Sequence, residues 1–278
     1  MAFTINAGDV ACEMLAPGVE RQRLLTDARV AGTKILLDRL ILTAGGATNL
    51  QIAPTDLAWF QVLEGELQLE SAAGRSSLGA AHIVFLPPGF TGSLHSARGA
   101  TILFAEVPRA GRFDPGFAVD PPALRIVDWT REPVLDSKHD ARKRIYVVTP
   151  KLFGTKAIKG EIIIYPAGTA GANHHHEGAE HFMYVLRGAG TAYANERQIP
   201  VRKGDLIYYD DGERHWLRCA DEKEMAFVEF FVPGVYRTVW APGAPVCTWL
   251  PTGTDIEGRE PARRIEAHSA AVASPADV

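Results

Sequence analysis

The chain has 278 residues, of which 46% are hydrophobic, enough for about two packed domains. Its formal net charge is -4, with 29 basic and 33 acidic residues and no Lys/Arg-rich run, so no nucleic-acid partner is expected. No apolar stretch approaches the ~20 residues needed to cross a bilayer, so no membrane partner is expected either.

The cysteines and the N-terminal sequence bear on the compartment. Cys12, Cys219 and Cys247 are few, odd in number and not arranged as CxxC pairs. The first residues lack a basic segment followed by an apolar one, which is the pattern of a signal peptide. The sequence therefore predicts a cytoplasmic protein without structural disulfides.

The first half of the chain reads as a short arm followed by strands. Residues 1–32 form an N-terminal arm with no clear amphipathic period. Residues 33–107 contain short apolar runs separated by Gly, Pro and Ser turns, for example at Gly45-Gly46 and Pro87-Pro88-Gly89. This pattern is typical of an all-β barrel or sandwich and not of an alternating α/β chain.

The rest of the chain divides into a connection, a second strand-rich region and a tail. Residues 108–141 are rich in Pro, Asp and Arg and include one extra strand candidate near residues 124–129. Residues 142–235 repeat the strand pattern. Residues 236–278 form a tail whose Trp240 and Trp249 supply aromatic area for docking on the body or on a second subunit, and the last ten residues are expected to be disordered. A homodimer or a higher homo-oligomer is the expected assembly.

An internal repeat sets the architecture. A shift of 123 residues places Gly168 on Gly45 and Gly188 on Gly65, and it places MYVLRGAG beneath FQVLEGEL. A register held over both halves predicts two tandem β-barrels of one design. At the same shift His174, His176, His181 and His215 fall on Gln51, Ala53, Ala58 and Gly92, so the first barrel is expected to bind no metal.

Four histidines in the second half are candidate metal ligands. His174 and His176 lie two residues apart and so share one face of a strand, and His181 opens the next apolar run. His215 follows the turn Asp210-Asp211-Gly212 and can close the cluster from a third strand. Imidazole groups suit divalent transition metals.

These motifs resemble the cupin superfamily. Its first motif, G(X)5HXH(X)3-4E(X)6G, is matched by Gly168, His174, His176 and Gly188, with His181 in the slot that most members fill with Glu. Its second motif, G(X)5PXG(X)2H(X)3N, is matched by Gly204, Gly212 and His215, with Asp210 and Cys219 in place of the Pro and the Asn. The resemblance implies two jelly-roll (double-stranded β-helix) barrels, a bicupin, and Glu180 competes with His181 as the third ligand.

The expected cofactor is one divalent transition metal in the second barrel. The resemblance favours Mn or Fe, and Zn and Ni are compatible with imidazole ligands. Glu229, in the apolar run from Met225 to Val232, is the candidate general base, although Glu106 at the equivalent place in the first barrel favours a structural hydrogen bond over that role. Residues considered for contacts with the substrate or with the ligands are Glu177, Glu180, Tyr193, Met183 and Phe227, and Arg144, Tyr146 and Lys156 are candidates to hold a carboxylate.

The layout also resembles that of (S)-ureidoglycine aminohydrolase, a manganese bicupin with a metal-free first barrel, although the substrate residues of that family are not matched. Three functions are therefore considered. The first is a metal-dependent enzyme that acts on a small polar metabolite by hydrolysis, deamination or isomerisation. The second is an Fe- or Mn-dependent cupin dioxygenase, and the third is a cupin that binds a small molecule without turnover.

Overall fold

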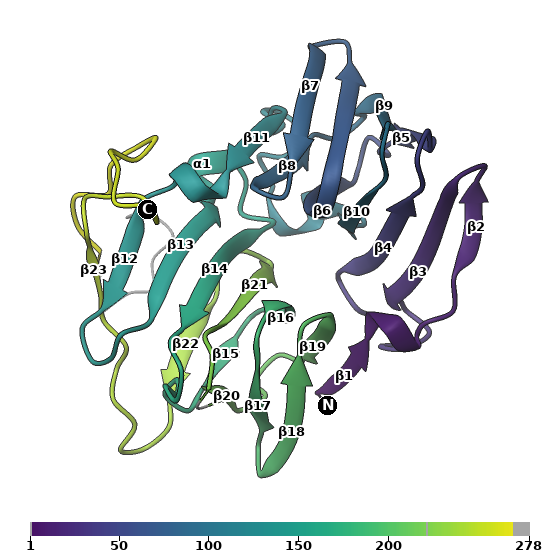
Figure 1. Ribbon diagram of the computed structural model, residues 1–278. Helices are drawn as coiled ribbons and strands as arrows, with labels where there is room; N and C mark the ends of the chain where they lie inside the picture. The colour runs from purple at the N-terminus through teal and green to yellow at the C-terminus, as the bar shows by residue number, and fades with distance from the viewer. Residues whose placement is uncertain (1, 221, 269–278) are drawn as a thin grey trace. The chain divides into compact units, whose positions relative to one another are not determined.

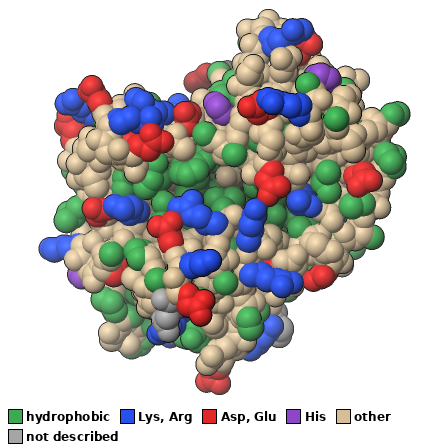
Figure 2. Space-filling model, viewed as in Figure 1, with side chains coloured by type: hydrophobic (Ala, Val, Ile, Leu, Met, Phe, Trp, Pro, Cys, Tyr) green, Lys and Arg blue, Asp and Glu red, His purple; other side chains and the backbone are tan. Residues whose placement is uncertain are grey.

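A computed structural model of the chain describes residues 2–220 and 222–268, and the disorder expected for the last ten residues lies outside that part. The chain divides into two compact units, residues 7–129 and residues 1–6 with 130–278, and both are built on β-strands (Figure 1). Among the described residues, no helix is long and apolar enough to cross a membrane. Acidic and basic side chains both appear across the face shown in Figure 2, as the small net charge of -4 suggests.

The unit formed by residues 7–129 is a barrel of ten strands, β2 to β11. One path of paired strands runs β11-β8-β6-β10-β4-β3-β2. The long strand β6 belongs to both layers, because its start pairs with β8 and β10 and its end pairs with β7 and β9. Short 3-10 turns lie at Ala7–Asp9 and Ala110–Phe113. The strands are β2 (Glu13–Ala16), β3 (Val19–Leu25), β4 (Leu36–Leu42), β5 (Ala47–Gln51), β6 (Leu57–Ser71), β7 (Gly74–Gly79), β8 (His82–Leu86), β9 (Thr91–His95), β10 (Ala100–Val107) and β11 (Arg125–Asp128).

The second unit is a barrel of two facing sheets. One sheet has the order β1-β19-β16-β21-β14-β13-β12-β23 and the other the order β18-β17-β20-β15-β22. One core cluster takes side chains from both, such as Val185 and Phe227 from the first sheet and Ala192 and Leu217 from the second. Its elements are β1 (Phe3–Asn6), β12 (Val134–Ser137), β13 (Lys143–Val148), α1 (Pro150–Phe153), β14 (Lys159–Tyr165), β15 (His174–Glu177), β16 (Glu180–Arg187), β17 (Ala189–Ala194), β18 (Arg197–Arg202), β19 (Asp205–Tyr209), β20 (His215–Cys219), β21 (Met225–Val232), β22 (Arg237–Trp240) and β23 (Trp249–Pro251), and the 3-10 turn Trp129–Arg131 lies at the unit boundary.

The internal repeat predicted from the sequence appears as matching strands. The bounds of β4, β7 and β8, moved by 123 residues, coincide with those of β14, β18 and β19. The two antiparallel barrels confirm the all-β, two-barrel fold class.

The two barrels have equivalent edge strands, of which β11 was predicted as the extra strand near residues 124–129 and β1 was not predicted. β11 pairs with β8 so that Arg125 lies opposite Phe85, and β1 pairs with β19 so that Phe3 lies opposite Tyr208. Phe85 and Tyr208 are 123 residues apart, so each barrel receives an added strand at the same edge.

The N-terminal residues thus contain strands β1, β2 and β3, where the sequence showed only an arm with no clear amphipathic period. The hydrophobic pattern of the sequence does not reveal β3, because the polar residue Gln22 is one of its buried residues. Its side-chain amide donates to the carbonyl oxygens of Ala7 at 2.7 Å and Val10 at 2.8 Å, which satisfies the buried group.

Of the two roles expected for the aromatic tail, the structure places Trp249 in the first, docking on the body. Trp249 is 2% exposed, lies in β23 beside β12 and packs in the core of the second barrel. It is therefore not available for the subunit contact that the sequence suggested. Trp240, in β22, lies against the site described next.

Candidate metal centre

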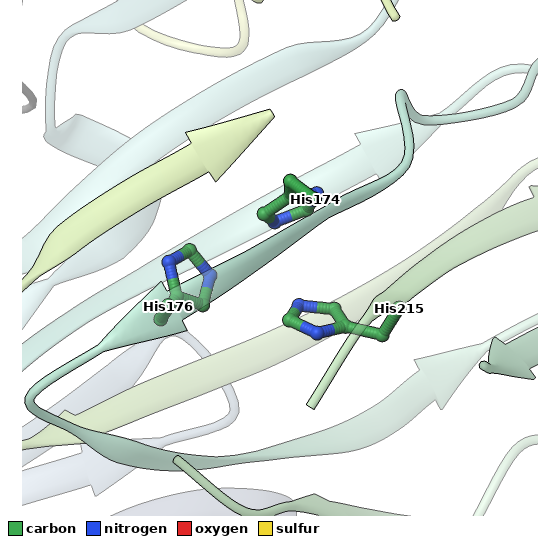
Figure 3. A group of neighbouring side chains, drawn as sticks. All are labelled: His174, His176 and His215. Atoms are coloured by element: carbon green, nitrogen blue, oxygen red, sulfur yellow. The ribbon is translucent and has the colours of Figure 1, made fainter. Parts of the chain in front are cut away.

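Three histidines are brought together by two paired strands of the second barrel. His174 and His176 lie on the same face of β15, and His174 is directly opposite His215, the first residue of β20. One ligand atom from each of the three lies within 4.8 Å of the others, and Figure 3 shows their rings turned toward one another. The spacing His-X-His and the turn before His215 therefore produce the predicted convergence.

His181 contributes a fourth ring beside this group. It lies near the start of β16, and its ring centre is 4.6 Å from that of His215 and 5.0 Å from that of His176. The side chain is 1% exposed, and neither ring nitrogen has a hydrogen-bond partner. A buried imidazole without any partner is costly in free energy, so a bound metal ion would explain its position.

Backbone carbonyls fix the tautomers of two ligands. A carbonyl oxygen can only accept a hydrogen bond. His174 Nδ1–H therefore donates to the backbone carbonyl oxygen of Ala172 at 2.8 Å, and His215 Nδ1–H donates to that of Glu213 at 2.7 Å. In both rings Nε2 then carries the lone pair, and Nε2 of His215 is buried without a hydrogen-bond partner. His176 Nδ1 lies 3.1 Å from Thr238 Oγ1.

The environment keeps the imidazoles neutral, which is the form that binds metal. Burial lowers the pKa of His174 to about 4 and that of His181 to about 3. Burial, followed by the neighbouring histidines, also lowers the pKa of His176 and of His215 well below the ordinary value. The donor set and its charge state therefore fit a divalent transition metal.

The carboxylates next to the ligands in sequence point elsewhere. Glu180 lies on the other face of β16 from His181, and its Oε2 accepts a hydrogen bond of 2.8 Å from Tyr208. Glu177 pairs with Arg237 and lies 3.3 Å from Nε2 of His175, the histidine that alternation turns away from the cluster.

The histidine cluster opens onto a cavity of about 390 Å³ within the second barrel. Met183 and Phe227 line it, as does Glu229, whereas Tyr193 stacks on the cavity residue Trp216 with ring centres 4.5 Å apart. Charged side chains form a polar wall of the same cavity. They include Arg142, Arg144, Lys159, Glu161 and Glu229.

Lys159 and Glu161 were missed in the sequence, although a signal was present. Both lie in β14, whose seven residues, KGEIIIY, are all buried. Two charged residues at alternate positions of an otherwise apolar strand face the same side and indicate a polar interior site. Lys156, the lysine considered instead, is exposed, whereas the other candidates for holding a carboxylate, Arg144 and Tyr146, are buried or nearly so.

Glu161 and Glu229 form a buried pair of carboxyl groups. They face each other across β14 and β21, and two neighbouring buried carboxyl groups disfavour both being charged, so one of the two is favoured to hold a proton. Burial alone would raise the pKa of Glu161, but the Arg144 guanidinium at 3.1 Å and the Lys159 ammonium at 3.7 Å hold that pKa at about 2. Burial and the Glu161 charge raise the pKa of Glu229 well above its ordinary value, so Glu229 carries the proton.

Comparison with known proteins agrees with this fold. A family model described as "Cupin domain" matches residues 161–231, the span from β14 to β21. The oxalate-binding protein of Thermotoga maritima is 28% identical over 67 residues, which is 24% of this chain and 55% of that protein, so the match spans about half of that curated relative.

Solved structures resemble the chain over most of its length. The protein Ylba from Escherichia coli is 15% identical, with a TM-score of 0.69 over 84% of this chain and 91% of that one. A putative glyoxylate-induced protein from Pseudomonas aeruginosa is 16% identical, with a TM-score of 0.72 over 85% and 91%. A single-residue variant of Bacillus subtilis oxalate decarboxylase is 13% identical, with a TM-score of 0.66 over 85% and 78%. At these identities the likeness shows the fold alone.

The fold and the histidine cluster together define a two-barrel β-protein with a candidate metal site in its second barrel. Residues 161–231 match the cupin domain, and the chain has a two-barrel fold like that of these solved structures. Of its two barrels, the second contains the matched cupin domain and all four of the predicted ligand histidines.

Proposed function

We propose that His174, His176, His181 and His215 hold one divalent transition metal, manganese or iron, and that the adjoining cavity is an active site. The reaction proposed is a metal-dependent hydrolysis, deamination or isomerisation of a small polar metabolite. When bound, the metal would supply a Lewis acid that polarises an oxygen of the substrate.

The observation that carries this proposal is that His174, His176 and His215 line the same cavity as the Glu161–Glu229 pair. A metal site alone is compatible with simple binding, but a buried carboxyl group whose pKa is raised well above its ordinary value is suited to general acid catalysis. Glu229 donates its proton to a leaving or rearranging group of the substrate. Arg144 and Lys159 stabilise the charge on Glu161 throughout, so the pair can lose and regain this proton.

The proposed substrate belongs to the small polar metabolites. The structural neighbours support the bicupin fold but do not transfer an activity, so ureidoglycine is only one candidate.

A second candidate function is binding without turnover. The Thermotoga maritima relative, which aligns with a quarter of this chain, is called an oxalate-binding protein, a name that specifies no reaction. A small organic acid is accordingly a candidate ligand for this cavity as well.

The test compares Glu229→Gln with Glu106→Gln, which changes the equivalent residue of the first barrel. Both variants and the unchanged protein are loaded with manganese or iron and screened with small acids, amides and ureido compounds for ammonia release, isomerisation and oxygen consumption. The expected result is turnover that Glu229→Gln lowers by roughly 10²–10⁴-fold without loss of metal, while Glu106→Gln leaves it near normal. Oxygen consumption would instead assign a dioxygenase, and ligands that bind the metal-loaded protein without any conversion would favour the binding function.

A further inference from the structure

Lys159 is a cation enclosed in the cavity wall of the second barrel. Its side chain is 3% exposed, and Nζ donates a hydrogen bond of 2.7 Å to Tyr236 Oη. Nζ also lies 4.9, 5.2 and 5.3 Å from the ring centres of Tyr236, Tyr146 and Phe231. Burial lowers the pKa of Lys159, whereas the Glu161 carboxylate, the aromatic faces and the Tyr236 hydroxyl counter that effect by stabilising the ammonium form.

The charges that line the cavity do not cancel. Arg142 is paired with Asp140 at 2.8 Å, and Arg237 is paired with Glu177. Arg144 and Lys159, in contrast, both approach Glu161, at 3.1 and 3.7 Å, and burial with the Glu161 charge raises the pKa of Glu229, so the Glu161–Glu229 pair favours a single negative charge. Two positive charges against one negative charge leave one positive charge without a counterion among these residues.

The first barrel provides an internal comparison that separates Lys159 from its neighbours. The repeat of 123 residues matches three charged residues of the second barrel with three of the first: Arg144 with Arg21, Glu161 with Asp38 and Glu229 with Glu106. This charged group therefore belongs to the framework that both barrels share. Arg21 and Asp38 still approach each other to 4.0 Å.

The residue equivalent to Lys159 is Leu36. Lys159 is thus a cation that the second barrel has in addition to the shared framework, as it has the four histidines. A buried charge that the framework does not require, facing the same cavity as the metal ligands, indicates a role in binding.

We propose that Lys159 binds the anionic group of the substrate and that the cavity accordingly takes a small monoanionic carboxylic acid. This inference rests on the proposed function, because it places the substrate in the same cavity. A single unbalanced positive charge matches a carboxylate better than a phosphate group, which carries a charge of about -1.5 to -2. The cavity of about 390 Å³, with Phe227, Phe231 and Trp249 in its wall, limits the acid to a small one.

The test measures thermal stabilisation of the full chain by glycolate, by its neutral amide glycolamide and by inorganic phosphate, with and without manganese. Binding to the folded state raises Tm by mass action. Glycolate is expected to raise the Tm of the unchanged protein, and glycolamide and phosphate are expected to raise it less. Lys159→Met should weaken glycolate binding roughly ten- to a hundredfold, since a charge-assisted hydrogen bond is lost, while Lys156→Met, on the exposed lysine three residues away, should bind normally.

Two further variants guard against a merely structural effect. Lys159→Arg keeps the charge and should retain part of the glycolate response, and Lys159→Gln serves if the methionine variant does not fold. Equal glycolate responses in the unchanged protein and in the neutral variants would overturn the proposal, as would a response to glycolamide or phosphate as large as that to glycolate. Metal content is measured on the same samples, so a protein that holds metal but ignores glycolate refutes the role of Lys159 and leaves the metal site standing.

Discussion

At the scale of single residues, His181 and His175 differ in surroundings although both lie next to the cluster in sequence. The His181 ring is buried among the other three rings with neither nitrogen hydrogen-bonded, whereas His175 Nε2 lies 3.3 Å from Glu177 Oε1. His181→Ala should therefore weaken manganese binding by more than the roughly 10–100-fold that loss of an outer contact costs. His175→Ala is the matched control and should bind normally by metal titration. Equal affinities for the two variants would exclude His181 from the ligand set.

Glu106 predicts a pH dependence of stability in the first barrel. Burial, followed by a hydrogen bond to Asp56, raises the pKa of Glu106 to about 7 from an ordinary value of 4.5. Between these two values the folded chain holds a proton that the unfolded chain has lost, so the free energy of unfolding falls as pH rises through this window. Glu106→Gln should flatten that fall in urea unfolding of the metal-free protein, and Glu66→Gln, at an exposed residue, should not. An unchanged slope in Glu106→Gln would show that Glu106 is not the titrating group.

At the scale of the elements, equivalent glycines bend the chain where it passes from one layer of each barrel to the other. Gly188 separates β16 from β17 with φ +77°, and Gly65 lies within β6 with φ +78°. A Cβ at Gly188 would overlap the carbonyl oxygen of Glu224, and a Cβ at Gly65 would overlap that of Gly99. Both the backbone angle and the close approach therefore require glycine at this bend.

Gly188→Ala is consequently expected to destabilise the second barrel by more than the ~1–2 kcal/mol that a left-handed backbone angle costs an alanine. Gly154→Ala has a similar φ of +73° with open space around the added Cβ, so it should show only the cost of the angle. Urea unfolding curves provide the measurement. A loss of stability that is no larger at Gly188 than at Gly154 would contradict the steric part of the explanation.

Elements were predictable from sequence where local pattern and repeat agreed. The strands of both barrels follow apolar runs bounded by Gly and Pro, and the repeat gives the bounds of β14, β18 and β19 from those of β4, β7 and β8. The edge strand β1 depends on a partner, β19, that is some two hundred positions away along the chain, so no local pattern marks it. The proximity of Glu161 and Glu229 was missed for a similar reason, because the two residues meet only through the pairing of β14 with β21.

At the scale of the whole molecule, the two barrels keep one framework and differ in their interior groups. The shared positions include the arginine and the two acidic residues of each barrel, whereas the histidines and Lys159 occur in the second barrel alone at these positions. A homo-oligomer is still a prediction, and the burial of Trp249 directs its test to other surfaces.

The proposed transition metal in the second barrel can be tested directly by metal analysis of the purified protein. The full chain is purified without a histidine tag beside the double variant His176→Ala/His215→Ala, and both are analysed before and after reconstitution. We expect close to one manganese or iron ion per chain in the unchanged protein and loss of that metal in the variant. Absence of metal after reconstitution, or equal metal in both proteins, would contradict the proposal.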